Sequence, residues 1–404
     1  MKNLFWAALH LIPGIGSAAL RSLKTAFGDG EAVWRAGESE LRQMKFKPQM
    51  LSELIEFRQK ISLDKLAEEL TRYDVHLLIE DDEDYPARLR QIFDPPFLLY
   101  CRGTLCGDEP SLGVVGARSA SPYGRQAAQS LSYDLAKAGL TIISGAAKGI
   151  DTQAHLGALK AKQRTIAVLG CGPDKVYPAE NKQLLQSIAQ TGAVISEYPL
   201  GTEPIAGHFP ARNRIISGMS MGILVVEAAK KSGSLITAEL ALSEGRDVFA
   251  VPGNIYSDKS QGCHKLIQQG AKLVTAAADI LEEYEAVLSR PSAVGAPSSD
   301  SPSKNQPAEL TLEQLAPPAE QTVSAAAVKA AAKPELPPMT ADEQAIYAVL
   351  PQDRDKAKST DEIIYKLRIN VSNIAFILLQ MKLKGLIEEV SPNFYARAVR
   401  ECVK

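Results

Sequence analysis

From about Val75 onward the chain alternates short apolar runs with segments of helical period, and this alternation restricts the folds open to it. The apolar runs are flanked by Gly or Pro and read LGVVGA, TIISGA, TIAVLG, AVISEY, ILVVEA and DVFAVPG. Amphipathic stretches such as YGRQAAQSLSYDLAKAG lie between them. Near-continuous apolar strands alternating with helices are typical of a parallel sheet covered on both faces. The sequence therefore predicts an α/β fold with a Rossmann-like, doubly wound parallel sheet.

The first 70 residues have a different pattern, which predicts a small domain of short helices. The stretch LIPGIGSAALRSLKTAFG places Pro13, Gly14 and Gly16 between two helical segments. It is either the turn of a helix-hairpin-helix element, whose backbone N–H groups face a phosphate, or an ordinary turn between helices.

The C-terminal third of the chain divides into two further parts. From about Ser289 to Pro338 it is rich in Pro, Ala, Ser and Glu, which predicts a flexible linker. From Met339 to the end, three helical segments and a hairpin predict a winged-helix domain. Its third helix is mostly apolar, with only Lys382 and Lys384 near its end, whereas helices that read duplex DNA usually carry several basic residues. We therefore expect this domain to contact protein or to bind duplex DNA weakly.

Charge is unevenly distributed along the chain. The net charge of the 404 residues is -2, but residues 111–274 hold 17 Lys and Arg against 11 Asp and Glu. The remainder holds 28 against 36, so the sheet region is basic and its flanks are acidic. A polyanion would therefore bind to the sheet region.

Cysteine usage and hydropathy bear on localisation. The five cysteines form no CxxC pair, which favours a reducing cytoplasm over a disulfide framework or a zinc site. No apolar run is as long as a membrane span, and the first residues, MKNLFWAALHLIPGIG, predict a folded helix rather than a signal peptide. We expect a cytoplasmic protein without membrane contact.

The loop GVVGARSASPYG follows the first strand of the predicted core, at the sheet edge where ligands of doubly wound folds bind. Gly116 permits close backbone approach, Ser119 and Ser121 offer hydroxyl groups, and Arg118 offers a cation to an anionic ligand. Alternatively, Arg118 forms a surface salt bridge. The loop is not GxGxxG, and the chain has no GxxxxGK[ST] stretch, so neither a dinucleotide site nor a P-loop is predicted.

The next two loops add further candidates. In SGAAKGIDTQAH, Ser144 and Gly145 end the strand, Gly145 and Gly149 bracket Lys148, and Asp151 is expected to cap the following helix. In GCGPDKVYPAENK, the candidates are a pair of lysines beside an aromatic ring that could stack on a base, namely Lys175, Lys182 and Tyr177. Alternatively, these lysines belong to a solvated face.

The stretch HFPARNRIISGMS places two arginines around Asn213, at the expected start of a helix. Planar guanidinium groups suit phosphate, so Arg212 and Arg214 are candidates for an anion site, although one of them could pair with Glu197 or Glu227. Those two carboxylates follow strands and could together perform glycosidic chemistry on a nucleotide.

Together these segments, in this order and spacing, closely resemble the DprA/Smf family of DNA-processing proteins over residues 75–285. The resemblance implies that residues 1–70 are a sterile-alpha-motif-like domain and residues 339–404 a winged helix. It also implies a dimeric, non-enzymatic protein without cofactors that binds single-stranded DNA. Such proteins protect incoming DNA in natural transformation, relieve blockage by the single-strand-binding protein and load RecA.

The resemblance also implies a phosphate pocket and a basic DNA contact at specific positions. The pocket maps onto Gly116, Arg118, Ser119, Ser144, Gly145 and Gly149, and the basic contact maps onto Lys182. The segment Arg212 to Arg214 matches the family motif as well. Ala117 and Lys148 depart from residues common in the family, as does the pair Cys263 and His264, for which we have no interpretation.

Two other functions compete with DNA binding. One is a nucleotide phosphoribohydrolase of the lonely-guy type, using Glu197 and Glu227, although KSGSLITAE stands where that family carries a PGGxGT-type loop. Release of free base from nucleoside monophosphates would identify it. The other is a transcription factor acting through the winged helix, which footprinting on a duplex promoter would identify.

Overall fold

The computed structural model describes residues 2–288, apart from residues 45, 47 and 108, and residues 339–398 with several gaps. It forms two compact units, Met1–Pro318 and Ala319–Lys404. The predicted linker, residues 289–338, lies outside the described residues. Within the described part, every helix is too short or too polar to cross a lipid bilayer.

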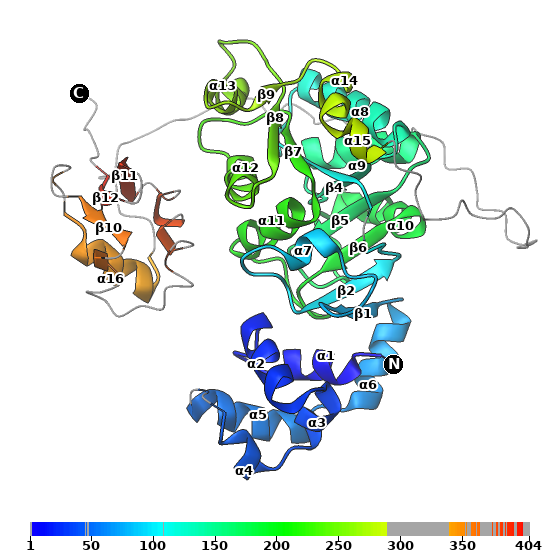
Figure 1. Cartoon of the computed structure of the whole chain (residues 1–404), viewed down its shortest axis with the longest axis vertical. Helices are drawn as coiled ribbons and strands as arrows, with labels where there is room; N and C mark the ends of the chain where they lie inside the picture. Colours follow the sequence, from blue (N-terminus) through cyan, green and yellow to red (C-terminus); the bar gives the residue numbers. More distant parts are fainter. Residues whose placement is uncertain are drawn as a thin grey trace, which may run out of the picture. The chain divides into compact units, whose positions relative to one another are not determined.

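The first unit is built on a nine-stranded sheet in the order β1-β2-β6-β5-β4-β3-β7-β8-β9 (Figure 1). Strands β3 to β9 pair in parallel, and β1 and β2 form an antiparallel edge beside β6. The six apolar runs become β3 to β8, so the expected parallel α/β sheet is confirmed. The strands are β1 (His76–Ile79), β2 (Leu98–Gly103), β3 (Ser111–Val115), β4 (Thr141–Ser144), β5 (Thr165–Leu169), β6 (Ala193–Ser196), β7 (Gly222–Val225), β8 (Asp247–Ala250) and β9 (Lys272–Leu273).

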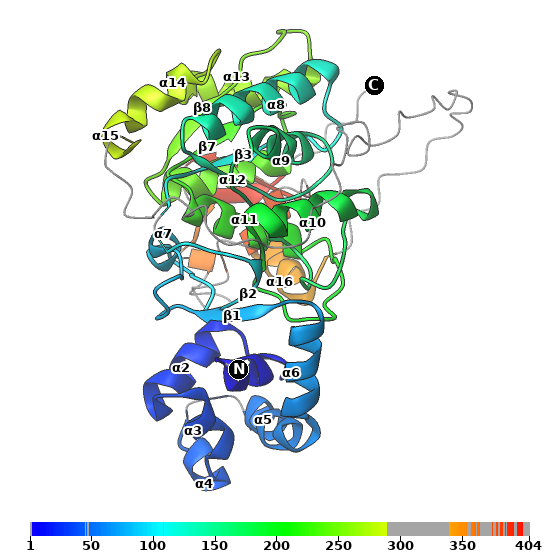
Figure 2. The ribbon, with the colours of Figure 1, turned by 90° about the vertical axis from the view of Figure 1, so that its right-hand side faces the viewer.

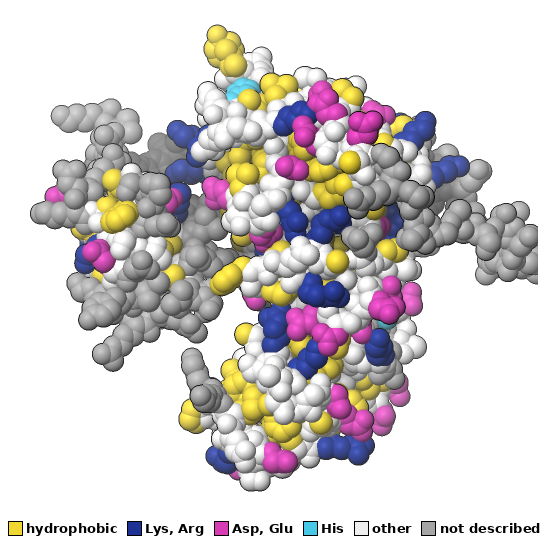
Figure 3. Space-filling model, viewed as in Figure 1, with side chains coloured by type: hydrophobic (Ala, Val, Ile, Leu, Met, Phe, Trp, Pro, Cys, Tyr) yellow, Lys and Arg dark blue, Asp and Glu magenta, His cyan; other side chains and the backbone are white. Residues whose placement is uncertain are grey.

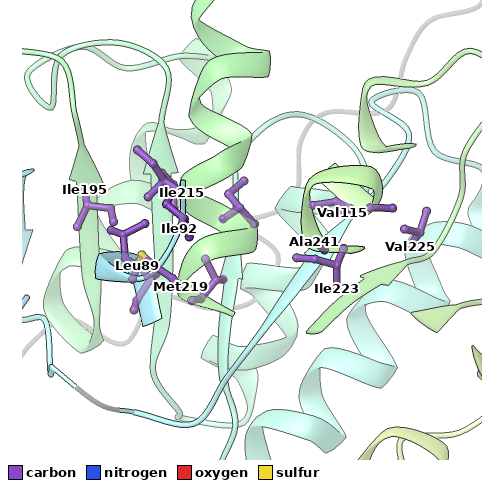
Figure 4. Packing of buried hydrophobic residues seen from close by; sticks show 14 of the residues in the cluster. Leu89, Ile92, Val115, Ile195, Ile215, Met219, Ile223, Val225 and Ala241 are labelled. Carbon is purple, nitrogen blue, oxygen red and sulfur yellow. The ribbon is translucent and has the colours of Figure 1, made fainter. Parts of the chain in front are cut away.

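Helices cover both faces of this sheet (Figures 1 and 2). Side chains alternate between faces along a strand, so Leu112 and Val114 of β3 pack under one helical layer while Val115 packs under the other. Figure 4 shows the second layer, where Ile215 of one helix lies beside the strand residue Ile195, and Ala241 of another lies beside the strand residue Ile223. The first layer contains α8 (Pro122–Lys137), α9 (Ile150–Lys160) and α10 (Lys182–Thr191), and the second contains α7 (Ala87–Arg90), α11 (His208–Met219), α12 (Gly233–Ser243) and α13 (Gln261–Gln268).

The strand order changes direction between β3 and β7. From β3 the chain proceeds outward through β4, β5 and β6, and it then returns to the other side of β3 to build β7, β8 and β9. Loops that leave β3 and β7 therefore diverge to opposite sides, and the crevice between them is where doubly wound folds bind ligands.

The N-terminal helices pack against the antiparallel edge of the sheet. Their apolar side chains share a core with Leu77, Phe97 and Tyr100 of β1, β2 and the preceding loop. At the glycine-containing turn, Gly14 has φ +80°, which favours glycine. The hydroxyl of Ser17, which follows this turn, donates to Glu197 and accepts from the N–H of Phe97. The helices are α1 (Leu4–His10), α2 (Ser17–Phe27), α3 (Gly30–Arg35), α4 (Glu38–Leu41), α5 (Pro48–Lys60) and α6 (Leu63–Arg72).

The second unit contains α16 (Ala341–Val349) and a three-stranded sheet in the order β10-β12-β11. The strands are β10 (Lys358–Ser359), β11 (Ile387–Ser391) and β12 (Phe394–Arg397), and β11 and β12 form the expected hairpin. Lys382 forms an ion pair with Glu389, and Lys384 with Glu343, all within this unit. Much of the expected second and third helices lies outside the described residues, so the winged helix stays a prediction.

His155 should make stability depend on pH. It is fully buried on α9, its Nδ1 lies 2.7 Å from Thr165 Oγ1, and burial lowers its pKa to about 3, with a smaller contribution from Arg212. An unfolded His has a pKa of about 6.5, so the stabilisation is present above that pH and declines as the pH falls toward 3. We expect a loss of about 2 kcal/mol in unfolding free energy between pH 7 and pH 5 from this residue.

Urea unfolding at both pH values, for the wild type and His155→Gln, measures this loss. The variant should be less stable at pH 7 and should show a smaller pH dependence. An equal pH dependence in the two proteins would contradict the assignment.

Candidate nucleic-acid interface

A cavity of about 440 Å³ lies at the carboxyl ends of β3 and β7, where the strand order changes direction. Its walls come from the loops after β3 and β4, the start of α11, the start of α12 and the loop before α13. The lining side chains that bear on ligand binding are Gly116, Arg118, Ser119, Asp151, Phe209, Arg212, Asn213, Lys231, Ser232, Gly233, Ser234, Thr237 and Lys259.

The loop after β3 is held close to the sheet and carries Arg118 at the rim of the cavity. A Cβ at Gly116 would lie 2.6 Å from Ile150 Cγ1, so this position has no room for a side chain. The Arg118 guanidinium lies over the Phe209 ring, 5.1 Å from its centroid. In the described part of the chain Arg118 has no carboxylate partner. The alternative prediction, a surface salt bridge, is therefore wrong for these residues.

Ser121, by contrast, is occupied by an internal carboxylate. Glu227 is 3% exposed and accepts hydrogen bonds from the Ser121 N–H at 2.9 Å and the Ser121 hydroxyl at 2.5 Å. A Cβ at Gly124 would lie 2.3 Å from the Glu227 carboxyl carbon, so glycine is needed there. The positive end of α8 is therefore neutralised from within the protein.

The loop after β4 is likewise fixed by an internal carboxylate, that of Asp151. Asp151 lies in the first turn of α9 rather than at its cap, and its Oδ2 accepts hydrogen bonds from the N–H groups of Gly145 and Ala147. Gly149 is the capping residue with φ +79°, and a Cβ there would lie 2.3 Å from the Ala117 carbonyl oxygen. The Ser144 hydroxyl is buried and donates to the Val114 carbonyl, so it is not directed to a ligand.

Arg212 forms the floor of the cavity. It is only 4% exposed, and its Nη1 donates to the carbonyls of Gly145 and Val168, which follow β4 and lie within β5. Burial lowers the pKa of Arg212 to about 10, opposed by the charge of Asp151, so the side chain is cationic at neutral pH. Burial raises the pKa of Asp151, opposed chiefly by Arg212. Arg212 thus holds two strand ends together and places a positive charge beneath the cavity.

Arg214 differs from the expectation of an anion site. Its Nη2 lies 2.7 Å from Glu197 Oε1, and both side chains are 15% exposed. Burial acts to raise the pKa of Glu197, but the charge and hydrogen bond of Arg214 hold it below its usual value. Arg214 is therefore the arginine with an internal partner, and it does not line the cavity. The helix α11 also begins earlier than expected, at His208, so Pro210 lies inside its first turn.

The three candidate lysines lie outside the cavity lining. Lys148 forms an ion pair with Glu180 at 2.8 Å, and Lys175 forms one with Glu203 at 2.6 Å. Lys182 is exposed at the first position of α10. Of the predicted residues, the cavity brings together Gly116, Arg118, Ser119, Arg212 and Asn213.

Several lining residues were not predicted. Phe209 contacts Tyr177, with ring centroids 5.3 Å apart, and Tyr177 is partly exposed. Lys231 and Lys259 face the cavity without an ion-pair partner among the described residues. The signal that could have located α12 is KSGSLITAE, where glycine and two serines precede an apolar helical run.

Cations are not gathered into one patch on the face shown in Figure 3. Lys and Arg side chains there are interspersed with Asp and Glu. Cations with no acidic partner among the residues that the structure describes, such as Arg118, Lys231 and Lys259, are therefore the ones available to an external anion.

Glu197 and Glu227 do not form a pair. They follow β6 and β7, and β5, β4 and β3 lie between those strands. Four strand spacings amount to about 19 Å, whereas the two carboxyl groups of a glycosidase are at most about 10 Å apart. The arrangement expected for glycosidic chemistry is absent for these two residues.

The fold and cavity define a class: a doubly wound α/β protein with a phosphate-compatible site at the point where its strand order changes direction. Residues 76–285 match the family model of DNA recombination-mediator protein A, and the chain belongs to that family.

The chain is also similar to individual proteins. DNA processing protein DprA of Streptococcus pneumoniae is 49% identical over 50% of this chain and 72% of its own. The X-ray structure of DprA from that organism is 39% identical over 70% of this chain and 98% of its own, with a TM-score of 0.62. The structure of DNA processing protein A from Helicobacter pylori, described for its single-stranded DNA binding mode, is 31% identical over 53% of this chain and 98% of its own, with a TM-score of 0.47.

The buried pair of Arg214 and Glu197 should stabilise the fold far more than an exposed pair does. Glu197→Gln leaves the guanidinium with only the more distant and exposed Asp94 at 3.4 Å as a counter-charge, so we expect it to lower the unfolding free energy by about 2 to 3 kcal/mol. The matched control is Glu203→Gln, because Glu203 is 68% exposed where it pairs with Lys175. That change should cost less than about 1 kcal/mol. Urea unfolding at pH 7 measures both, and equal losses would contradict this assignment.

Proposed function

We propose that this protein is a recombination mediator that binds single-stranded DNA at the cavity between the β3 and β7 loops. The observation that carries the proposal is the Arg118 guanidinium, which has no carboxylate partner in the described part of the chain and lies on the Phe209 ring at the cavity rim. The description of the family as recombination mediators supports the same conclusion.

The lining chemistry suits a nucleic-acid strand. Arg118, Lys231 and Lys259 can replace the counterions of backbone phosphates, which is the main source of affinity for nucleic acids. Phe209 in the lining and the exposed Tyr177 beside it offer aromatic rings on which bases stack without regard to sequence. Cations and aromatic rings side by side are typical of sequence-tolerant single-strand binding.

The size of the cavity favours a single strand over a duplex. A volume of about 440 Å³ can admit an unstacked nucleotide, whereas bases in a duplex stay inside the stack. In the second unit, Lys382 and Lys384 are both engaged in ion pairs, which supports a weak or absent role in duplex binding there.

The proposal includes binding without catalysis. The separation of Glu197 and Glu227 by three strands argues against the nucleotide hydrolase that those residues would serve. On the family resemblance we extend the proposal to action as a homodimer, to protection of incoming DNA in natural transformation, and to RecA loading on strands covered by single-strand-binding protein.

The test is fluorescence anisotropy of a labelled oligo-dT strand titrated with the full chain at several salt concentrations. Arg118→Ala should weaken binding and reduce the slope of log K against log salt by about 0.7, the value for one phosphate contact on a single strand. Lys160→Ala is the control, because Lys160 is exposed at the far end of α9. Equal affinities and slopes for the two variants would contradict the proposed site.

A further inference from the structure

Helix starts meet at the cavity, and internal carboxylates occupy two of the neighbouring N–H clusters. Glu227 binds the N–H and hydroxyl of Ser121 at the start of α8. Asp151 binds the N–H groups of the loop that leads into α9. An external phosphate would meet negative charge at both places.

The start of α12 differs, because within the described chain no carboxylate is bound there. Gly233 is exposed, and a Cβ on it would meet nothing within 4 Å, so the space before the helix is open. The Ser232 and Ser234 hydroxyls bond to each other at 2.7 Å and both line the cavity. The Ser232 hydroxyl accepts the Ser234 N–H at 3.4 Å, and this cap, unlike a carboxylate, leaves the positive end of the 11-residue helix without a neutralising charge.

Thr237 supplies an independent sign of a ligand. Its side chain lies one turn into α12 and lines the cavity, yet it is only 1% exposed. Its Oγ1 is buried and has no hydrogen-bond partner in the described structure. A helical Thr usually satisfies its hydroxyl on a carbonyl of the preceding turn, and a buried unpaired hydroxyl destabilises the fold. Thr237 thus combines a place in the cavity lining with an unpaired hydroxyl that could donate to a bound group.

Two lysines complete the charge around this helix start. Lys231 immediately precedes the capping Ser232 and is exposed. Lys259 comes from the segment before α13, where its carbonyl accepts the Ala228 N–H at 2.7 Å and fixes the segment beside the β7 loop. Both lysines line the cavity.

We propose that the first turn of α12, with Lys231, Lys259 and the hydroxyl of Thr237, is the phosphate subsite of this cavity. The helix N–H groups and lysines bind the phosphate oxygens, and Thr237 donates its hydroxyl from the inner side. The inference rests on the proposed function in taking a DNA phosphodiester as the ligand. The phosphate of a free mononucleotide offers the same chemistry, so the experiment separates these sources.

The experiment compares Thr237→Val, Thr237→Ser and Lys231→Ala with the wild type. Thr237→Val removes the hydroxyl at nearly constant shape, so oligo-dT should bind about 3- to 10-fold more weakly, while Tm is unchanged or raised. Thr237→Ser keeps the hydroxyl and should bind as the wild type does. Thr191→Val is the control, because Thr191 is exposed at the end of α10. Lys231→Ala should reduce the salt slope of oligo-dT binding.

Competition by dTMP and by inorganic phosphate identifies the source of the phosphate. If neither displaces oligo-dT from the wild type while Thr237→Val still weakens its binding, the subsite takes a phosphodiester. If dTMP displaces oligo-dT from the wild type and binds Thr237→Val more weakly, the subsite also takes a phosphomonoester. Oligo-dT and dTMP binding unchanged in both Thr237→Val and Lys231→Ala would overturn the subsite.

These results separate the subsite from the proposed function. Weaker DNA binding by Arg118→Ala alone would leave the function standing and remove the subsite. Binding of dTMP that is lost in Thr237→Val, in a protein that does not bind oligo-dT, would keep the subsite and remove the function.

Discussion

The site depends on the hydrogen bonds that the Arg212 guanidinium makes beneath the cavity. The guanidinium joins the carbonyls of Gly145 and Val168 across neighbouring strands, in the electrostatic field of Asp151. Gly145 is required for this contact, since a Cβ there would lie 2.4 Å from Arg212 Nη2. Because Nη1 of the guanidinium donates to these two carbonyls and Nε donates to Asn213, Arg212 sets the shape and charge of the cavity floor.

The charged groups around the switch point, where the strand order changes direction between β3 and β7, fall into two sets with different roles. Internal groups are satisfied by one another: Arg214 by Glu197, and Glu227 by Ser121. The cavity-facing cations have no such carboxylate partner in the described chain. The first set fixes loops and helix starts, and the second can exchange counterions for a bound polyanion. This division explains how a chain of net charge -2 can present a local site for an anionic ligand.

The fold could be predicted from the sequence because six apolar runs carry a strong, local signal of buried parallel strands. The antiparallel edge of β1 and β2 carries a weaker signal, and its pairing with β6 depends on contacts distant in the chain. For the site, glycine-rich loops located Gly116 and Arg118. Which of Arg212 and Arg214 lines the cavity could not be predicted. On a helix, two arginines separated by one residue point in different directions and so meet different partners. Thr237 and Lys259 were missed because only folding brings them to the β3 loop.

Hydrogen–deuterium exchange of the full chain, with and without oligo-dT, is the most direct measurement of whether the switch-point cavity binds single-stranded DNA. We expect protection in peptides that cover residues 116–121, 208–214 and 231–237. Exchange should be unchanged around residues 160–164, which precede β5 and lie at the amino ends of the strands. Protection confined to the N-terminal helices or to the second unit, with none around the cavity, would contradict DNA binding at this site.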